Sequence, residues 1–101
     1  MTMARYRVLY WKQFPAQVRA WDEDGSISVP LPGRFERALN VAAMVEGSIS
    51  SDDYLDGWQW GEEQERSGDA KTVAEAIAAE LSDAYSWSDL QKMVREYKAK
   101  G

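Results

Sequence analysis

Tryptophans and basic residues recur through the first two thirds of the chain, and these side chains suit molecular recognition. Tryptophan and arginine are enriched at the positions that dominate the binding energy of protein interfaces. A guanidinium or ammonium group also packs favourably over an indole ring. We therefore predict an aromatic–basic surface that binds a protein partner, formed by Arg7, Trp11, Lys12, Arg19, Trp21, Arg34, Trp58 and Trp60.

Burial in the core is the competing interpretation of the tryptophans, with the basic side chains as their solvated rim. The predicted strands hold few other large apolar residues, which favours burial for any individual ring. A single sheet with helices on one side cannot bury both of its faces, however, so some rings should stay exposed. A large exposed aromatic patch usually marks a binding site. Stacking of single-stranded RNA bases on such a surface is a further alternative.

The chain contains neither cysteine nor histidine, and this excludes several kinds of chemistry. Zinc sites with Cys or His ligands, Cys nucleophiles, Ser-His-Asp triads and imidazole acid–base catalysis are all ruled out. Catalysis by paired carboxylates needs two groups held about 5–9 Å apart around a cleft. The spacing of the acidic residues defines no such pair. We predict no catalytic residues, no metal site and no cofactor, and an interaction module rather than an autonomous enzyme.

Acidic residues cluster at positions 22–24, 52–56 and 62–65. The run Asp22-Glu23-Asp24-Gly25 is similar to the middle of an EF-hand calcium loop. That loop needs a bidentate Glu six residues after its glycine, and Leu31 stands there instead. Turn formation and solubility explain these acidic groups better than metal binding does.

The chain of 101 residues has 17 acidic and 12 basic residues, which gives a net charge of −5. This charge disfavours non-specific binding to phosphate backbones, so we do not expect nucleic acid as the partner. No apolar run approaches the ~20 residues that span a bilayer. The first residues pass directly into a strand pattern and lack the apolar stretch of a signal peptide. We predict a cytoplasmic protein without a membrane partner.

The periodicity of apolar residues predicts an α+β fold. Alternation predicts strands at 5–12, 16–21, 26–29 and 54–61, the last with Tyr54, Trp58 and Trp60 on one face, and helical spacing predicts helices at 34–46 and 69–85. The segment 62–68 is predicted as a charged loop, and Asp69 as the residue that caps the second helix. Because a run of strands precedes the helices, we expect a small, mainly antiparallel sheet of three or four strands with two helices on one face.

A C-terminal amphipathic helix is predicted as an extension at 87–101, after a single α+β domain at 1–86. The segment 88–91 has the pattern of a capping box. Apolar side chains then recur at i, i+3, i+4 and i+7, and the stripe consists of Leu90, Met93, Val94 and Tyr97. This stripe could dock on the domain, form a homodimer or bind the groove of a partner. Docking or dimerisation fits the sequence better than membrane binding, because acidic residues lie among the basic ones.

Most of the chain resembles a small bacterial family described as virulence factor. The resemblance rests on residues 4–12 and 15–19, on 29–32 followed by Arg34-Phe35, on parts of 54–61, and on the helix after Gly68. It covers about residues 4 to 85, so the last helix lies beyond it. The joint pattern is more specific than any of its pieces.

The resemblance implies interaction rather than a known reaction. Longer members, of the conserved virulence factor C type, look like fusions to HEAT-repeat regions, which implies a regulatory or adaptor role. Free-standing members are associated with gene neighbourhoods for folate and corrinoid one-carbon transfer. This implies an alternative role as an accessory component of a cofactor-dependent enzyme system, binding a small anionic ligand or the enzyme itself. The resemblance brings no catalytic residues to this chain.

Overall fold

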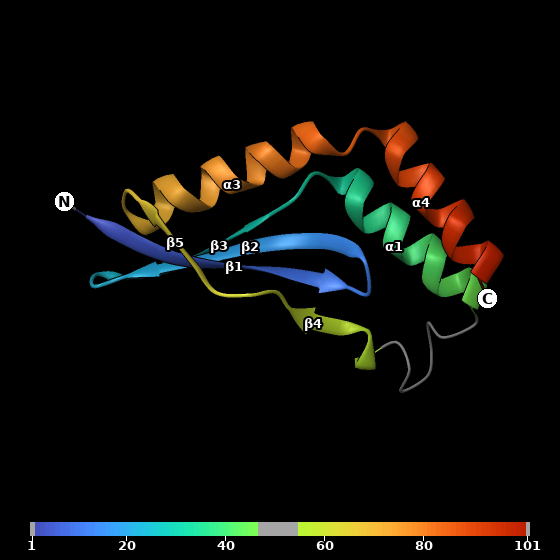
Figure 1. The fold of residues 1–101 in the computed structure, drawn as a ribbon, viewed down its shortest axis with the longest axis horizontal. Coiled ribbons are helices and arrows are strands. Elements are labelled where there is room, and N and C mark those ends of the chain that lie inside the picture. The colour runs from blue at the N-terminus through green and yellow to red at the C-terminus, as the bar shows by residue number, and fades with distance from the viewer. Residues whose placement is uncertain (1, 47–54, 101) are drawn as a thin grey trace.

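An antiparallel sheet with one helix along it and two helices at its end makes up the described fold (Figure 1). The computed structural model describes residues 2–46 and 55–100. Within these residues the elements are β1 (Met3–Trp11), β2 (Phe14–Asp22), β3 (Gly25–Pro30), α1 (Gly33–Glu46), β4 (Trp58–Trp60), β5 (Gln64–Ser67), α3 (Ala70–Ala84) and α4 (Trp87–Lys100). The α+β fold class predicted from the sequence is confirmed.

β1 is the central strand of the sheet. It pairs with β2 on one side and with β4 and β5 on the other, while β3 lies beyond β2. Each of these pairs is antiparallel. Side chains alternate between the two faces of a sheet. Val8, Val18 and Val29 are aligned across the first three strands, so they share one face.

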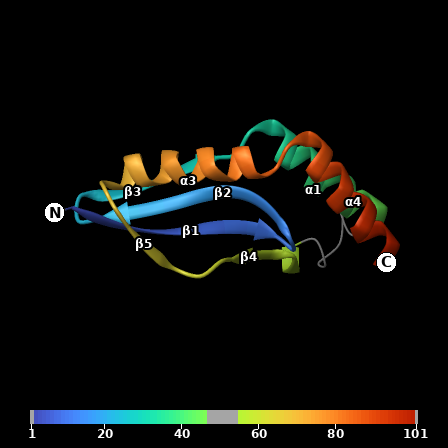
Figure 2. The same cartoon turned by 45° about the horizontal axis from the view of Figure 1, so that its top comes forward.

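α3 covers the face that carries these valines. Its apolar stripe includes Val73, Ala74 and Ile77, all buried at the helical spacing that turns them toward the sheet. Within the described part of the chain, the opposite face of the sheet has no helix over it (Figure 2). The domain therefore has a covered face and an open face.

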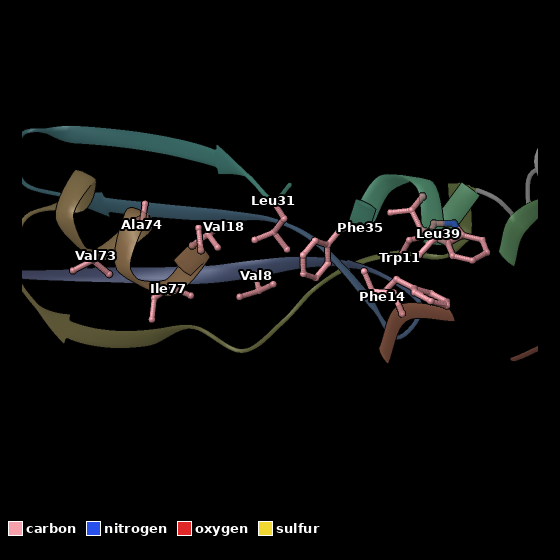
Figure 3. Close-up of a cluster of buried hydrophobic side chains, with 14 of the residues drawn as sticks. Val8, Trp11, Phe14, Val18, Leu31, Phe35, Leu39, Val73, Ala74 and Ile77 are labelled. Atoms are coloured by element: carbon pink, nitrogen blue, oxygen red, sulfur yellow. The ribbon is translucent and has the colours of Figure 1, made fainter. Parts of the chain in front are cut away.

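A second part of the core lies at the end of the sheet, beside α1 and α4 (Figure 3). Trp11 and Phe14 are fully buried there, with ring centroids 6.5 Å apart. They belong to the same buried cluster as Leu39 of α1 and Leu90 of α4. A Cβ atom on Gly57 would lie 2.6 Å from Trp11 Nε1, so only glycine permits this close approach. The helices thus close over this end of the sheet and bury its aromatic rings.

The strand predicted at 54–61 is shorter in the structure. β4 covers only Trp58–Trp60, and Leu55 and Asp56 are helical. Tyr54 lies outside the described residues. Glycine is a weak strand former, and Gly57 and Gly61 flank the short strand on either side.

The prediction of a loop at 62–68 is wrong, because part of it forms β5. This strand pairs with the first half of β1, and Glu65 lies opposite Arg5. The Glu65 carboxylate is 3.3 Å from Arg5 Nε. Every residue of β5 is exposed, so the strand shows no apolar alternation and only its cross-strand partner identifies it.

The N-terminal caps of the last two helices use carboxylates. Asp69 caps α3 as predicted, because its carboxylate accepts a 2.7 Å hydrogen bond from Thr72 N–H. The capping box predicted at 88–91 is wrong by two residues. Ser86 Oγ accepts a hydrogen bond from Asp89 N–H, and the Asp89 carboxylate accepts one from Ser86 N–H. These bonds from backbone N–H groups lower the pKa of Asp69 and Asp89.

Asp22 joins the β2–β3 hairpin to the start of α3. Its carboxylate accepts hydrogen bonds from Ala70 N–H at 2.8 Å, from Asp24 N–H at 2.8 Å and from Gly25 N–H at 3.2 Å. The bond from Ala70, followed by the bond from Asp24, lowers the pKa of Asp22. The acidic turn compared above with a calcium loop is thus organised around hydrogen bonds of the fold.

Candidate functional site

Half of the residues predicted for the aromatic–basic surface come together on the open face of the sheet: Arg7, Arg19, Trp21 and Trp60. Arg7 on β1 lies directly opposite Arg19 on β2. Trp21 is two residues further along β2 and so shares the face of Arg19. Trp60 comes from β4, on the other side of β1. With Ser26 of β3 these four residues line a hollow of about 310 Å³, which we call the open-face site.

The two guanidinium groups of the open-face site have no acidic partner among the residues that the structure describes. Arg5, on the same face of β1, differs in this respect. Its guanidinium lies 3.0 Å from the Glu63 carboxylate and 3.3 Å from that of Glu65. Like charges placed directly opposite on a sheet are destabilising, so the pairing of Arg7 with Arg19 opposes folding. The open-face site is a positive patch that the described chain leaves without a counter-ion.

The two tryptophans add apolar surface beside this charge. Trp60 is 43% exposed and Trp21 is half-buried. Paired guanidinium groups bind a carboxylate or phosphate by charge-assisted hydrogen bonds. An apolar or planar group packs well against an indole ring. The open-face site therefore suits an anionic group with an apolar neighbour.

Trp11, Lys12 and Trp58 lie toward the helical end of the sheet and do not line the open-face site. Trp11 is fully buried, so its predicted place on an exposed surface is wrong. Lys12 Nζ lies 5.3 Å from the Trp11 ring centroid and donates a 2.9 Å hydrogen bond to the Tyr97 hydroxyl. Trp58 is half-buried against the core. These side chains are engaged in packing because α1 and α4 close over this end.

Arg34 is also distant from the open-face site, since it lies at the start of α1 and bonds the end of α3. Its Nη2 donates to the Ser82 carbonyl at 2.6 Å, and its Nε and Nη2 donate to the Tyr85 carbonyl at 3.2 and 3.1 Å. The last carbonyls of a helix lack partners within the helix, and a positive charge is favourable there. Arg34 therefore has a structural role, as the cap that joins α1 to α3.

The predicted apolar stripe of α4 faces the rest of the domain. Leu90 is fully buried, and Met93, Val94 and Tyr97 are half-buried against the core. α4 packs along α1. Of the alternatives for this helix, the observed contacts correspond to docking on the domain, and Leu90 is unavailable to a partner in this fold.

Sequence reasoning missed an apolar surface on the outside of α1 and α4. Val41, Met44 and Val45 of α1 are exposed, as is Trp87 of α4. Val41 and Trp87 help to line a second hollow of about 300 Å³, and the Arg37 guanidinium lies 5.7 Å from the Trp87 ring. The signal in the sequence was an α1 segment with apolar residues on more than one face.

The acidic side chains of the described chain do not gather into a metal site. Within the described residues, 2–46 and 55–100, no group of three or more His, Cys, Asp or Glu is placed to hold a metal ion. Over that part of the chain, no helix is long and apolar enough to cross a membrane.

Comparison with known proteins places these features in a family. The profile of the family described as virulence factor matches residues 9–94, from the second half of β1 into α4. The matched region contains every residue of the open-face site except Arg7. No curated protein and no solved structure matches the chain. Because the family profile extends from residue 9 to residue 94 of a 101-residue chain, this protein belongs to the virulence factor family.

Proposed function

We propose that this protein is a non-enzymatic interaction module with a regulatory role, which binds a partner protein through the open-face site. One observation carries the proposal. Arg7 and Arg19 lie opposite each other without a carboxylate partner in the described chain, between two tryptophans. An acidic group of a partner would supply the missing counter-charge, and its neighbours would pack on the rings of Trp21 and Trp60.

Binding energy is available at this site because the free protein leaves it unsatisfied. A carboxylate between two guanidinium groups removes their repulsion and gains charge-assisted hydrogen bonds. Tryptophan and arginine also supply a large share of the energy at protein interfaces when they become desolvated. The partner thus stabilises an arrangement that costs the isolated domain free energy.

The shape of the open-face site favours a protein surface over a deep-binding ligand. Its volume of about 310 Å³ is near the lower end of the ~300–1,000 Å³ found for small-molecule pockets. The residues that line it come from adjacent strands of one sheet. A sheet face presents a broad and shallow surface, which a partner protein can cover.

Affinity capture tests this proposal with a matched control. The wild-type protein, the Arg7→Ala/Arg19→Ala variant and the Lys71→Ala/Lys92→Ala variant are each immobilised and exposed to native lysate. Both double variants lose the same charge, but the lysines are exposed on α3 and α4. Mass spectrometry should find a partner on the wild type and on the lysine variant, and several-fold less of it on the arginine variant. Equal recovery on all three would overturn the proposed binding surface.

A small anionic ligand is a second candidate, as expected of an accessory component of a one-carbon enzyme system. The observation in its favour is the position of two indole rings and two guanidinium groups around one hollow. Such a set suits a planar anion. Thermal-shift measurements with folates, corrinoids and nucleotides test it. A rise in Tm for the wild type but not for Arg7→Ala/Arg19→Ala would support this candidate, and no shift with any of these compounds would remove it.

A further inference from the structure

Two edge strands of the sheet, β5 and β3, differ in their protection against an additional strand. β5, at one edge, carries Glu65 and Arg66, which form ion pairs with Arg5 and Glu80. β3, at the other edge, has no charged residue between Gly25 and Pro30. Figure 3 shows β3 as the outermost strand, and within the described chain it pairs only with β2. Proteins commonly protect edge strands with charged side chains, because an open edge accepts another strand.

The outward-facing residues of β3 are Ser26, Ser28 and Pro30, and of these only the two serines have a backbone N–H. Leu31 N–H donates a 3.0 Å hydrogen bond to the Ala16 carbonyl of β2. In an antiparallel ladder, alternate residues bond to the same neighbour. Because Leu31 faces β2, Val29 and Ile27 also face β2. The backbone N–H and C=O groups of both serines therefore point away from β2. Both serines are exposed, so these two residues offer two donors and two acceptors to a further strand.

The side-chain rows that cross this edge lead into the open-face site. Ser28 is aligned with Arg19 on β2, which is aligned with Arg7 on β1. Ser26 is aligned with Trp21. Neighbouring strands lie about 4.8 Å apart, so a strand added beside β3 would place its side chains about 10 Å from the backbone of Arg19. Only the short side chains of serine would stand between them, and an arginine side chain can extend over a serine.

We infer that an acidic, extended segment of a partner protein adds to β3 as an antiparallel strand and directs carboxylates over Ser28 toward Arg19. The inference rests on the proposed function and specifies the chemistry and geometry of the partner. Antiparallel addition follows the pattern of every strand pair in the described sheet. In strand addition, main-chain hydrogen bonds supply affinity and side-chain sites supply selectivity. Here the backbone groups of Ser26 and Ser28 supply the main-chain hydrogen bonds, and the side chains of Arg7 and Arg19 supply the selectivity.

Synthetic peptides test this arrangement even while the natural partner is unidentified. The probe is a seven-residue peptide of alternating threonine and glutamate with blocked ends. One control replaces glutamate by lysine, and a second carries a methyl group on each glutamate amide nitrogen. The methyl groups remove the donors that would face β3 but keep the charge. Binding is followed by NMR titration of the isotope-labelled protein, together with hydrogen exchange at the Ser26 and Ser28 amides.

The acidic peptide should slow exchange at both serine amides, whereas the lysine peptide should leave exchange unchanged. Loss of the main-chain hydrogen bonds in the methylated peptide should weaken binding about tenfold. Arg19→Glu should weaken binding of the acidic peptide at least as much, because it replaces attraction by repulsion.

Two substitutions at Ser28 examine the same contact from the side of the protein. Ser28→Pro removes an N–H group that faces outward, a change that an edge strand accommodates. Ser28→Thr keeps this group and is the matched control. The proline variant should bind the acidic peptide about tenfold less tightly, and the threonine variant should bind it like the wild type. Thermal unfolding verifies that both variants fold, and the methylated peptide provides the same test on unaltered protein.

Each contrary outcome has a defined meaning. Equal binding of the methylated and unmethylated peptides would overturn strand addition but leave anion binding at the open-face site intact. Equal binding of the acidic and lysine peptides, or tighter binding of a single-stranded oligonucleotide, would overturn the acidic protein partner. If Arg7→Ala/Arg19→Ala abolished partner capture while no peptide protected the serine amides, the inference would fail and the proposed function would stand.

Discussion

Two regions of this molecule contain tryptophan beside basic residues, and they use these residues in different ways. At the helical end of the sheet, Trp11 is fully buried, and Arg34 donates hydrogen bonds to the end of α3. On the open face, Arg7 and Arg19 have no acidic partner within the described chain, and Trp60 is 43% exposed. The side chains of the first region stabilise the fold, whereas those of the second region remain accessible for binding.

This difference shows why residue type alone is a poor guide to function. A guanidinium group can satisfy helix carbonyls or bind a partner, and an indole ring can fill a core or form an interface. Which of these roles a side chain takes depends on the helices and strands that surround it. α1 and α4 close over one end of the sheet, and no described helix covers the open face (Figure 2).

The largest expected effect separates the two regions by their tryptophans. Trp11→Ala removes a fully buried ring, and such changes cost about 3–5 kcal/mol of unfolding free energy. Trp60→Ala, at a half-exposed cross-strand position, should cost about 1 kcal/mol or less. Urea unfolding of the two variants measures both values. Similar losses for both would contradict the division between structural and available tryptophans.

The arginines should differ in the same direction by a smaller amount. Arg34→Ala leaves the Ser82 and Tyr85 carbonyls without their donor and should cost about 1–3 kcal/mol. Arg34→Lys should restore only part of this loss, because lysine lacks the planar fork of donors. Arg19→Ala serves as the comparison, with no loss expected. An Arg34→Ala variant as stable as the wild type would refute the capping role.

A further effect depends on pH and concerns Asp22, which links the β2–β3 hairpin to the start of α3. Hydrogen bonds, from Ala70 N–H first, lower the pKa of Asp22 in the folded state. A carboxylate with a lowered pKa stabilises the fold above its unfolded pKa of about 3.9, and this contribution is lost as the pH falls through the folded value.

Asp22→Asn should therefore reduce stability at neutral pH and flatten the decline in stability below about pH 4. Thermal melts between neutral and acidic pH record this dependence. Glu23→Gln, at the neighbouring exposed carboxylate, is the matched control. If both variants followed the wild-type acid profile, the bonds of Asp22 would contribute nothing to the acid stability of the protein.

The smallest expected effect has the opposite sign. Arg7→Ala removes the repulsion with Arg19 and should leave stability unchanged or raise it by about 0.2–1 kcal/mol. Arg5→Ala is the control on the same strand face. It loses exposed ion pairs with Glu63 and Glu65 and should lower stability by up to about 1 kcal/mol. A matching loss in the two variants would mean that Arg7 contributes to folding like Arg5.

Much of the fold could be predicted because it follows local rules. Alternation along β1 to β3, helical spacing in α1 and α3, and the cap at Asp69 all depend on near neighbours in the chain. β5 was missed for the opposite reason. Its residues are polar and exposed, and its strand conformation depends on pairing with the start of β1, about 60 residues away in sequence.

The candidate site could be predicted only in part. Composition and spacing selected the residue types and excluded catalysis by histidine or cysteine. They placed Arg19 in a strand and Arg34 at the start of a helix but could not show which of the two has a partner within the fold. The register of β1 against β2 places Arg7 opposite Arg19, and the start of α1 lies close enough to the end of α3 for Arg34 to reach the Tyr85 carbonyl.

The sequence alone was thus sufficient to predict most of the helices and strands and to exclude imidazole and thiol chemistry. It also identified the indole and guanidinium groups that a binding site could use. Which of those groups stay available was decided by contacts between distant segments. Burial and pairing are properties of three-dimensional neighbours, and the described helices cover one face and one end of the sheet.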